Sequence, residues 1–208
     1  MAARPSTFGN MVLALTLICL VCAGLLGLVQ HVTAERIERT NQEKENKAIA
    51  QVVPGFSDET ASENPVIEKT EVGESIVFTA RKREEIVGYA VKVRTGGFGG
   101  PLVMMVGFTP DGTIHNTSVI SHSETPGLGA KITDPSCPPR TQVIGKNPAT
   151  TVMDAKKYRG DIDAITASTI TSRAFLKGVS IAHEVFRSLN PIQEEPVQNP
   201  ENNEQQPQ

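Results

Sequence analysis

The chain of 208 residues has no tryptophan, two tyrosines, three cysteines and no excess of positive charge. A net charge of −3 argues against nucleic-acid binding, which needs a basic face, and the few aromatic residues offer no platform for stacked bases. Only one cysteine lies outside the apolar N-terminal run, which excludes a disulfide framework in the rest of the chain. What remains is the composition of a globular protein, with 38% hydrophobic and 21% charged residues.

Met11–Val29 is a run of 19 residues without charge, and at about 1.5 Å per residue it spans close to the ~30 Å of a membrane's hydrocarbon core. A cleaved signal peptide, ending near Ala34, is the alternative. The apolar part of a signal peptide usually covers about 7–15 residues, so we expect an uncleaved anchor. Cys19 and Cys22 lie inside this run, where small buried hydrophobes are expected rather than a redox pair.

Hydrophobic periodicity predicts an α+β fold, in which a single transmembrane helix precedes a compact domain of antiparallel strands and a C-terminal helix. The expected order is a tail and anchor (1–34), a stalk helix and linker (35–74), the domain (75–190) and a disordered tail (191–208). Within it we predict strands at 75–80, 86–93, 102–108 and 114–121, a turn at 109–112, a helix from 169 or 170 to about 189, and loops at 57–74 and 132–150.

Two segments carry the candidate chemistry. The first is Asp163–Ser172, where five hydroxyl side chains occur within seven residues just ahead of the amphipathic helix. Helix N-terminal hydroxyls usually cap the helix, but unpaired N–H groups and the helix dipole also make this position a phosphate site. The second is His122–Lys131, where Pro126, Gly127 and Gly129 force an irregular backbone that can approach a flat ligand closely.

Taken together, Ser123-Glu124-Thr125-Pro126-Gly127-Leu128-Gly129-Ala130-Lys131 and the hydroxyl-rich segment resemble the FMN-binding domain of the G subunit of Rnf (Rsx) electron-transport complexes. The C subunit of the sodium-pumping NADH:quinone reductase is a related protein. The resemblance covers most of the chain, from the membrane segment to about residue 189.

In that family the flavin phosphate is joined to a threonine by a phosphodiester bond. Asp163, Thr166 and Thr169 match the family pattern, and Thr169 falls on the acceptor position. Ala167 stands where glycine is usual, and Ser168 where alanine is usual. The resemblance implies covalent FMN at Thr169, attached by a separate flavin transferase that uses FAD and magnesium, because a threonine hydroxyl is a poor nucleophile by itself.

The remaining site residues are hypotheses built on this resemblance. Thr166, Ser168, Thr171 and Ser172 would cap the helix or bind the phosphate. The isoalloxazine ring needs a wall and polar contacts, which we expect from Glu124, Thr125, Leu128, Gly129 and Lys131. Lys131 would stabilise negative charge on a reduced flavin, although a surface lysine is the simpler interpretation.

Other titratable groups have weaker interpretations. Asp163 serves the transferase, caps a turn or is simply solvated, since a carboxylate beside a phosphate is repelled. His122 and Glu124 lack a third metal ligand, so we predict no metal site. We expect Cys137 to be an incidental loop thiol, and no residue is assigned as catalytic.

The sequence thus predicts a membrane-anchored, electron-carrying flavoprotein subunit of an ion-translocating ferredoxin:NAD-type complex. Its expected partners are the other subunits, a flavin transferase and the lipid bilayer. The alternative is a structural or regulatory module of such a complex that has lost covalent flavin. The resemblance places the chain in the cytoplasmic (inner) membrane as a single-pass protein, with its domain on the periplasmic side. Counting basic residues beside the anchor favours the opposite orientation.

Overall fold

The computed structural model describes residues 8–53, 55, 66–82 and 85–189, and the predicted disordered tail (191–208) lies outside them. The chain divides into two compact units, Met1–Asn46 and Lys47–Gln208. Helix α1 begins in the first unit and ends in the second.

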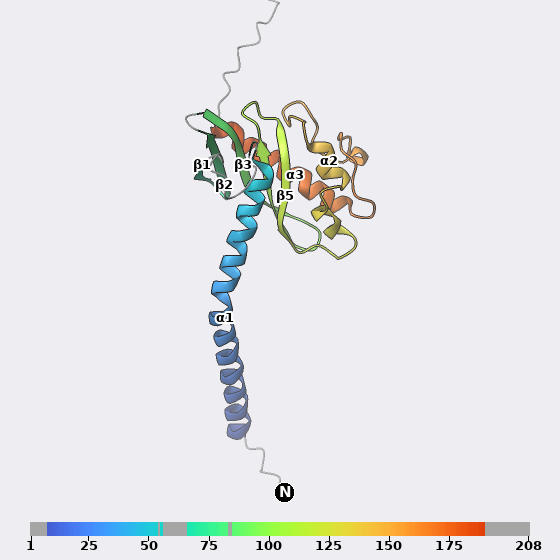
Figure 1. Ribbon diagram of the computed structural model, residues 1–208. Helices are drawn as coiled ribbons and strands as arrows, with labels where there is room; N and C mark the ends of the chain where they lie inside the picture. The colour runs from blue at the N-terminus through green and yellow to red at the C-terminus, as the bar shows by residue number, and fades with distance from the viewer. Residues whose placement is uncertain (1–7, 54, 56–65, 83–84, 190–208) are drawn as a thin grey trace, which may run out of the picture. The chain divides into compact units, whose positions relative to one another are not determined.

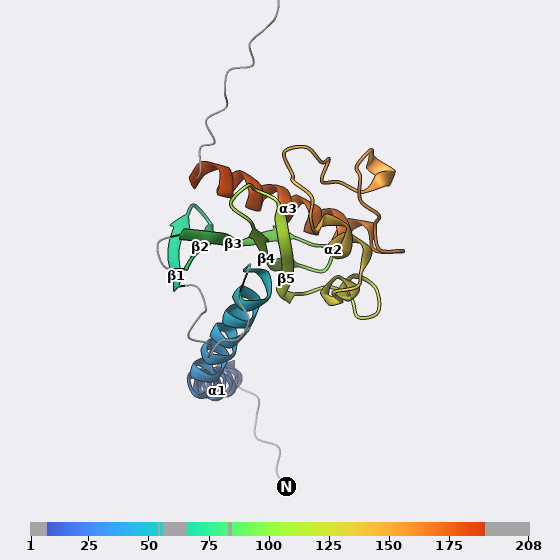
Figure 2. The ribbon, with the colours of Figure 1, turned by 45° about the horizontal axis from the view of Figure 1, so that its top comes forward.

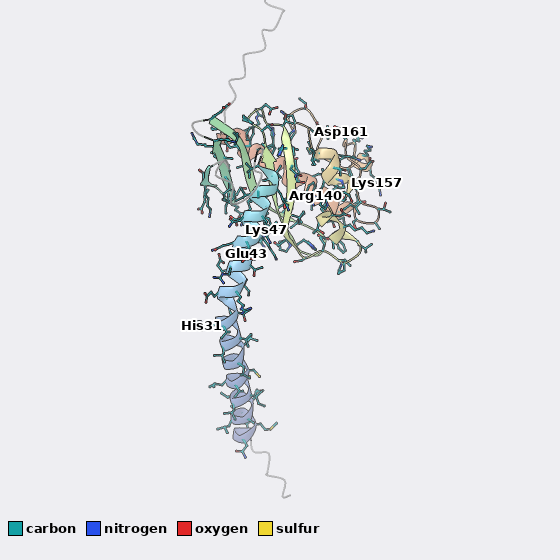
Figure 3. The ribbon with its side chains drawn as sticks, in the orientation of Figure 1. His31, Glu43, Lys47, Arg140, Lys157 and Asp161 are labelled. Carbon is teal, nitrogen blue, oxygen red and sulfur yellow. The ribbon has the colours of Figure 1, made fainter. Side chains whose placement is uncertain are left out.

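In the first unit the described residues form most of helix α1 (Phe8–Val52), and its apolar side chains are exposed (Figure 1). Among the described residues this is the one helix long and apolar enough to cross a membrane, which fits single-pass anchoring. Helix α1 continues past the apolar run into the polar residues expected to form the stalk. Figure 3 labels His31 and Glu43 along α1, and both side chains are exposed.

The second unit contains a five-stranded antiparallel sheet in the order β1-β2-β3-β4-β5, so each strand pairs with its neighbour in sequence. Its strands are β1 (Val66–Val72), β2 (Ser75–Lys82), β3 (Glu85–Gly96), β4 (Pro101–Phe108) and β5 (Ile114–His122). The turn predicted at 109–112 joins β4 to β5. The α+β prediction is confirmed, and so are the four predicted strands.

Helix α3 (Thr169–Leu189) packs along one face of the sheet (Figure 2). Its apolar residues recur at three- and four-residue spacing, and Phe175, Val179 and Phe186 are fully buried. Tyr89 and Val91 alternate along β3 with residues of the opposite face and join this core.

The last turn of α1 covers a smaller core on the other face. Ala48, Ile49 and Val52 are buried there with Phe78 and Met105. The side chain of Ser118 donates a hydrogen bond of 2.8 Å to the Gln51 amide oxygen. The stalk's last turn is therefore part of the folded unit.

Strand β1 corrects the prediction of a loop over 57–74. Residues 66–72 form a strand that pairs with β2, whereas 56–65 lie outside the described residues. The segment is dominated by charged and polar residues, so it lacks the apolar alternation by which a strand is recognised. Polar side chains are tolerated there because β1 lies at an edge of the sheet.

The prediction of a surface loop over 132–150 is also wrong in part. The segment contains the end of a 3₁₀ helix, η1 (Gly129–Thr133), and a short helix, α2 (Pro138–Val143). Ile132 and Val143 are fully buried in the main core. Prolines are a misleading signal here because two of them open α2, where their missing N–H groups cost nothing.

Arg140, labelled on α2 in Figure 3, is almost completely buried. Its guanidinium donates hydrogen bonds to the backbone oxygens of Thr117 and Thr133, the latter at 2.7 Å. Burial lowers the pKa of Arg140 from its ordinary value. The buried arginine thus joins β5 to the end of η1, beside the loop that follows β5.

Candidate functional site

A cavity of about 380 Å³ lies where three segments far apart in the sequence meet. The segments are the glycine-rich β3–β4 loop, the loop after β5 and the start of α3. The lining residues are Phe98, Glu124, Thr125, Leu128, Gly129, Ala167, Ser168, Thr169, Ile170 and Thr171. The volume lies within the range of about 300–1,000 Å³ that is common for small-molecule sites.

The structure brings together most of the residues predicted for the site. Glu124, Thr125, Leu128, Gly129, Ser168, Thr169 and Thr171 all line this cavity. Thr166 and Lys131 are exposed and are not among the lining residues. Whether any of these residues binds flavin stays a prediction.

Sequence reasoning missed Phe98 and Ile170, and it named Ala167 only as a departure from the family pattern. Phe98 has glycine on both sides, at positions 96, 97, 99 and 100, and its side chain is 68% exposed. The signal that the sequence offered was a large apolar residue with two glycines on each side. Leu128 and Ile170 are exposed as well, so three apolar side chains surround the cavity.

Glu124 is 6% exposed and has protein partners for both carboxylate oxygens. Oε1 accepts hydrogen bonds from the backbone N–H groups of Phe98 at 2.7 Å and Gly99 at 3.4 Å. Oε2 accepts one from the Thr171 hydroxyl at 2.8 Å. One side chain therefore contacts all three segments that form the cavity, because Glu124 itself belongs to the loop after β5.

The start of α3 is organised by its hydroxyl groups. The Ser172 hydroxyl accepts a hydrogen bond from the Ile165 N–H at 2.9 Å and donates one to the Ser168 carbonyl at 3.0 Å. The Ser172 N–H donates to the same Ser168 carbonyl, also at 3.0 Å. The N–H groups of residues 169–171 therefore precede the first helical hydrogen bond, at the positive end of the helix dipole. The half-buried Thr169 is the first residue of the helix.

Ala167 adopts a left-handed backbone conformation, with φ of +62°. This region costs an ordinary L-residue roughly 1–2 kcal/mol and costs glycine little. The conformation turns the chain from the loop into the first turn of α3. A glycine at this position would make the same turn without the strain.

Asp163 lies beside this segment but is not among the residues that line the cavity. Its carboxylate accepts hydrogen bonds from Gln142 and Lys156, both at 2.8 Å, and its N–H donates to the Gln142 side-chain oxygen. These bonds lower the pKa of Asp163, with the one from Lys156 contributing most. Asp163 thus fastens the chain ahead of the hydroxyl-rich segment to α2.

Two further acidic side chains, Asp161 and Asp154, hold the loop before Asp163 in place. Asp161, labelled with Lys157 in Figure 3, accepts a hydrogen bond from the Val152 N–H at 2.8 Å. Arg173 forms a two-bond ion pair with Asp154, at 2.8 and 3.1 Å, and covers the Tyr158 ring. The loop is therefore attached both to itself and to the second turn of α3.

The remaining candidates take structural positions. His122 Nδ1 accepts a hydrogen bond of 3.2 Å from the Glu124 N–H. Cys137, expected to be an incidental loop thiol, is instead 6% exposed and packs in the core. Burial raises its thiol pKa, which disfavours the reactive thiolate. Within the described residues, no three histidine, cysteine or acidic side chains gather as a metal site.

Comparison with known proteins identifies two matching families. Residues 97–184 match the FMN-binding domain, and residues 10–52 match the RnfG N-terminal region. The first match contains every residue that lines the cavity.

Curated relatives match nearly the whole chain. The G subunit of the Na⁺-translocating ferredoxin:NAD⁺ oxidoreductase complex of Acetobacterium woodii is 34% identical, over 86% of this chain and 91% of its own length. The G subunit of the ion-translocating oxidoreductase complex of Stutzerimonas stutzeri is 32% identical, over 83% and 78%.

A solved structure shares the fold. The C subunit of the Na⁺-translocating NADH-quinone reductase of Parabacteroides distasonis superposes with a TM-score of 0.50 at 20% identity, over 72% of this chain and 94% of that one. The identity and coverage of the curated relatives, together with the two family matches, show that the chain belongs to the family of G subunits of Rnf-type ion-translocating oxidoreductase complexes.

Proposed function

We propose that the cavity holds one FMN, joined through its phosphate to Thr169, and that the chain relays electrons within a membrane complex. The observation that carries this proposal is the position of Thr169. It is the first residue of α3, it lines the cavity, and the unpaired N–H groups of the helix follow it. A hydroxyl placed there can carry a phosphate covalently while the helix N-terminus stabilises the negative charge.

The other cavity residues suit the rest of an FMN molecule. Phe98, Leu128 and Ile170 supply apolar surface for a flat ring, and Thr125 and Ser168 supply polar groups. When bound, FMN provides the electron-transfer chemistry, which none of these side chains has. The protein's part is to bind the cofactor, orient it and shape its surroundings.

Two of the residues predicted for the site, Thr166 and Lys131, are exposed and are not among the residues that line the cavity. Lys131 would act on a reduced flavin through its charge, so replacing it by methionine should lower the flavin midpoint potential. An unchanged potential in that variant would remove Lys131 from the site.

The proposed setting of the domain follows from the family. The relatives are named as subunits of ion-translocating ferredoxin:NAD⁺ or oxidoreductase complexes. We therefore propose that α1 anchors this chain in the cytoplasmic membrane lipid, with the domain on the periplasmic side. Other subunits of the complex would supply and receive its electrons, and a flavin transferase would load the cofactor.

One observation favours a second candidate function. Ala167 occupies a left-handed conformation at a position where the family pattern has glycine. The resulting strain lies two residues from Thr169, within the stretch that a flavin transferase must recognise. If it prevents attachment, the chain is a structural or regulatory module of the complex without covalent flavin.

Intact mass of the full-length chain, co-expressed with an active flavin transferase, separates the two functions. We expect one FMN-sized adduct in the wild type and in Thr150→Ala, and none in Thr169→Ala. Thr150 is the control because it is an exposed threonine outside the hydroxyl-rich segment and is not among the residues that line the cavity. A folded wild-type chain without adduct would favour the structural module.

A further inference from the structure

We propose that Glu124 is a positioning residue, whose carboxylate holds the Phe98 loop and the start of α3 as opposite walls of the cavity. Its consequence for flavin rests on the function proposed above. This role is separate from the expectation that Glu124 supplies a polar contact to the ring, which stays a prediction.

The carboxylate is engaged by the protein at both oxygens. These oxygens accept three hydrogen bonds, from the N–H groups of Phe98 and Gly99 and from the Thr171 hydroxyl. Hydrogen bonds to an ionised acceptor are roughly twice as strong as neutral ones. Because Thr171 is 1% exposed and Glu124 is 6% exposed, water does not offer the Thr171 hydroxyl an equivalent partner.

The surrounding glycines leave space for this carboxylate. A Cβ atom on Gly97 would lie 2.0 Å from Oε1, and one on Gly129 would lie 2.4 Å from Oε2. Gly96, the neighbour of Gly97, has no atom within 4 Å of its own added Cβ. Two segments thus lack side chains at the points where the Glu124 oxygens fit.

The backbone of Phe98 is held by this carboxylate. The Phe98 side chain is 68% exposed and lines the cavity, while glycines on both sides give its backbone wide conformational freedom. The hydrogen bond from its N–H to Glu124 is 2.7 Å long. Glu124 therefore fixes the backbone that carries the Phe98 ring.

Hydrogen–deuterium exchange of the full-length, flavin-free chain in detergent tests this role. In Glu124→Ala, amide exchange in the Phe98 loop should accelerate by about tenfold or more, since one charge-assisted hydrogen bond is lost. Glu124→Gln keeps an acceptor oxygen and should accelerate exchange less. The exposed Glu184→Gln is the matched control and should leave the loop unchanged. Unchanged exchange in folded Glu124→Ala overturns the proposal.

A double-mutant cycle provides a second, ligand-free test that separates positioning from general destabilisation. Gly97→Ala should destabilise the wild type but have a smaller effect in Glu124→Ala, because most of its clash is with the carboxylate. Gly96→Ala should show no such coupling. If Glu124→Ala does not fold, the cycle is run with Glu124→Ser, whose short side chain also removes the clash and should show the same coupling. Additive effects for Gly97 and Glu124→Ala contradict the proposal.

The flavin-loaded protein provides the third test. Glu124→Ala should change the visible circular dichroism of bound FMN, because Phe98 is no longer fixed beside it, while the adduct at Thr169 still forms. Retained dichroism together with altered loop exchange rejects the inference about flavin. Loss of adduct in the wild type rejects the proposed function instead and leaves the exchange results interpretable.

Discussion

The two walls of the cavity differ in the residues that they place where the backbone is crowded or adopts a left-handed conformation. The glycine wall consists of the lining residues Phe98 and Gly129 together with the glycines at 97, 99 and 100 beside Phe98. It has glycine where another group approaches closely, as at the Glu124 oxygens. The hydroxyl wall, residues 167–171, has alanine at the position that needs a left-handed backbone. A Cβ placed 2.0–2.4 Å from an oxygen forces atoms to move, whereas a Cβ at positive φ costs roughly 1–2 kcal/mol. Close approach is therefore the stricter requirement of the two.

The difference also concerns charge. The glycine wall surrounds a buried carboxylate that meets two backbone donors and one hydroxyl. The hydroxyl wall has its carboxylate, Asp163, outside the cavity, half-exposed and bonded to Lys156 and Gln142. A phosphate at the start of α3 would therefore meet hydroxyl and N–H groups rather than the Asp163 charge.

The largest expected effect comes from Gly129→Ala in the glycine wall. The added Cβ would lie 2.4 Å from Glu124 Oε2 and 2.7 Å from the Thr171 oxygen, at the two ends of one hydrogen bond. We expect a loss of about 1–3 kcal/mol in unfolding free energy, as for an overpacked core. Denaturant unfolding checks this, with Gly96→Ala as control. Equal stability of the two variants would mean that this wall is not sterically strict.

A smaller effect of opposite sign is expected from Ala167→Gly in the hydroxyl wall. Glycine removes the strain of the left-handed conformation but makes the unfolded chain more flexible, which leaves a net gain of about 0.5–1 kcal/mol. Ala149→Gly, at an exposed position without positive φ, should lower stability instead. The same Ala167→Gly variant should be flavinylated at least as fast as the wild type. A loss of stability would show that the wall is not strained.

The smallest effect is expected from the carboxylate outside the cavity. The folded-state pKa of Asp163 lies below its ordinary value of 3.8, so its ionised form stabilises the fold above that pH. This contribution is lost as the pH falls through the folded-state pKa. The stability difference between the wild type and Asp163→Asn should therefore be small at neutral pH, shrink with added salt and fade as the pH falls below about 4. A difference that persists at lower pH would show that the charge is not its source.

Local sequence patterns mark both segments of the site, but they do not predict that the segments meet. Hydroxyls, prolines and glycines point to Thr169 and Leu128, and both residues line the cavity. Phe98 escapes such patterns because its own loop carries no polar group that points to a ligand. Asp163 has three open interpretations in the sequence, and the bonds from Gln142 and Lys156 place it outside the cavity lining.

The errors in the fold have the same origin. The polar sequence of edge strand β1 lacks alternation and so predicts a loop, yet pairing with β2 alone places it in the sheet. The prolines of segment 132–150 predict a surface position, although Ile132 and Val143 fill the core beside α3. In each case pairing or packing with another segment decides the structure.

The sequence by itself determined the apolar anchor, the period-two strands, the amphipathic helix and the family, because each follows from a pattern of residues close together in the chain. Only the tertiary structure decided that Glu124 is buried between two glycines, that Ala167 takes a left-handed turn and that Phe98 stands at the cavity. These features depend on which atoms of separate segments come within hydrogen-bonding distance of one another. That distance is fixed by the packing of α3 and the β5 loop on the sheet, and no local pattern encodes it.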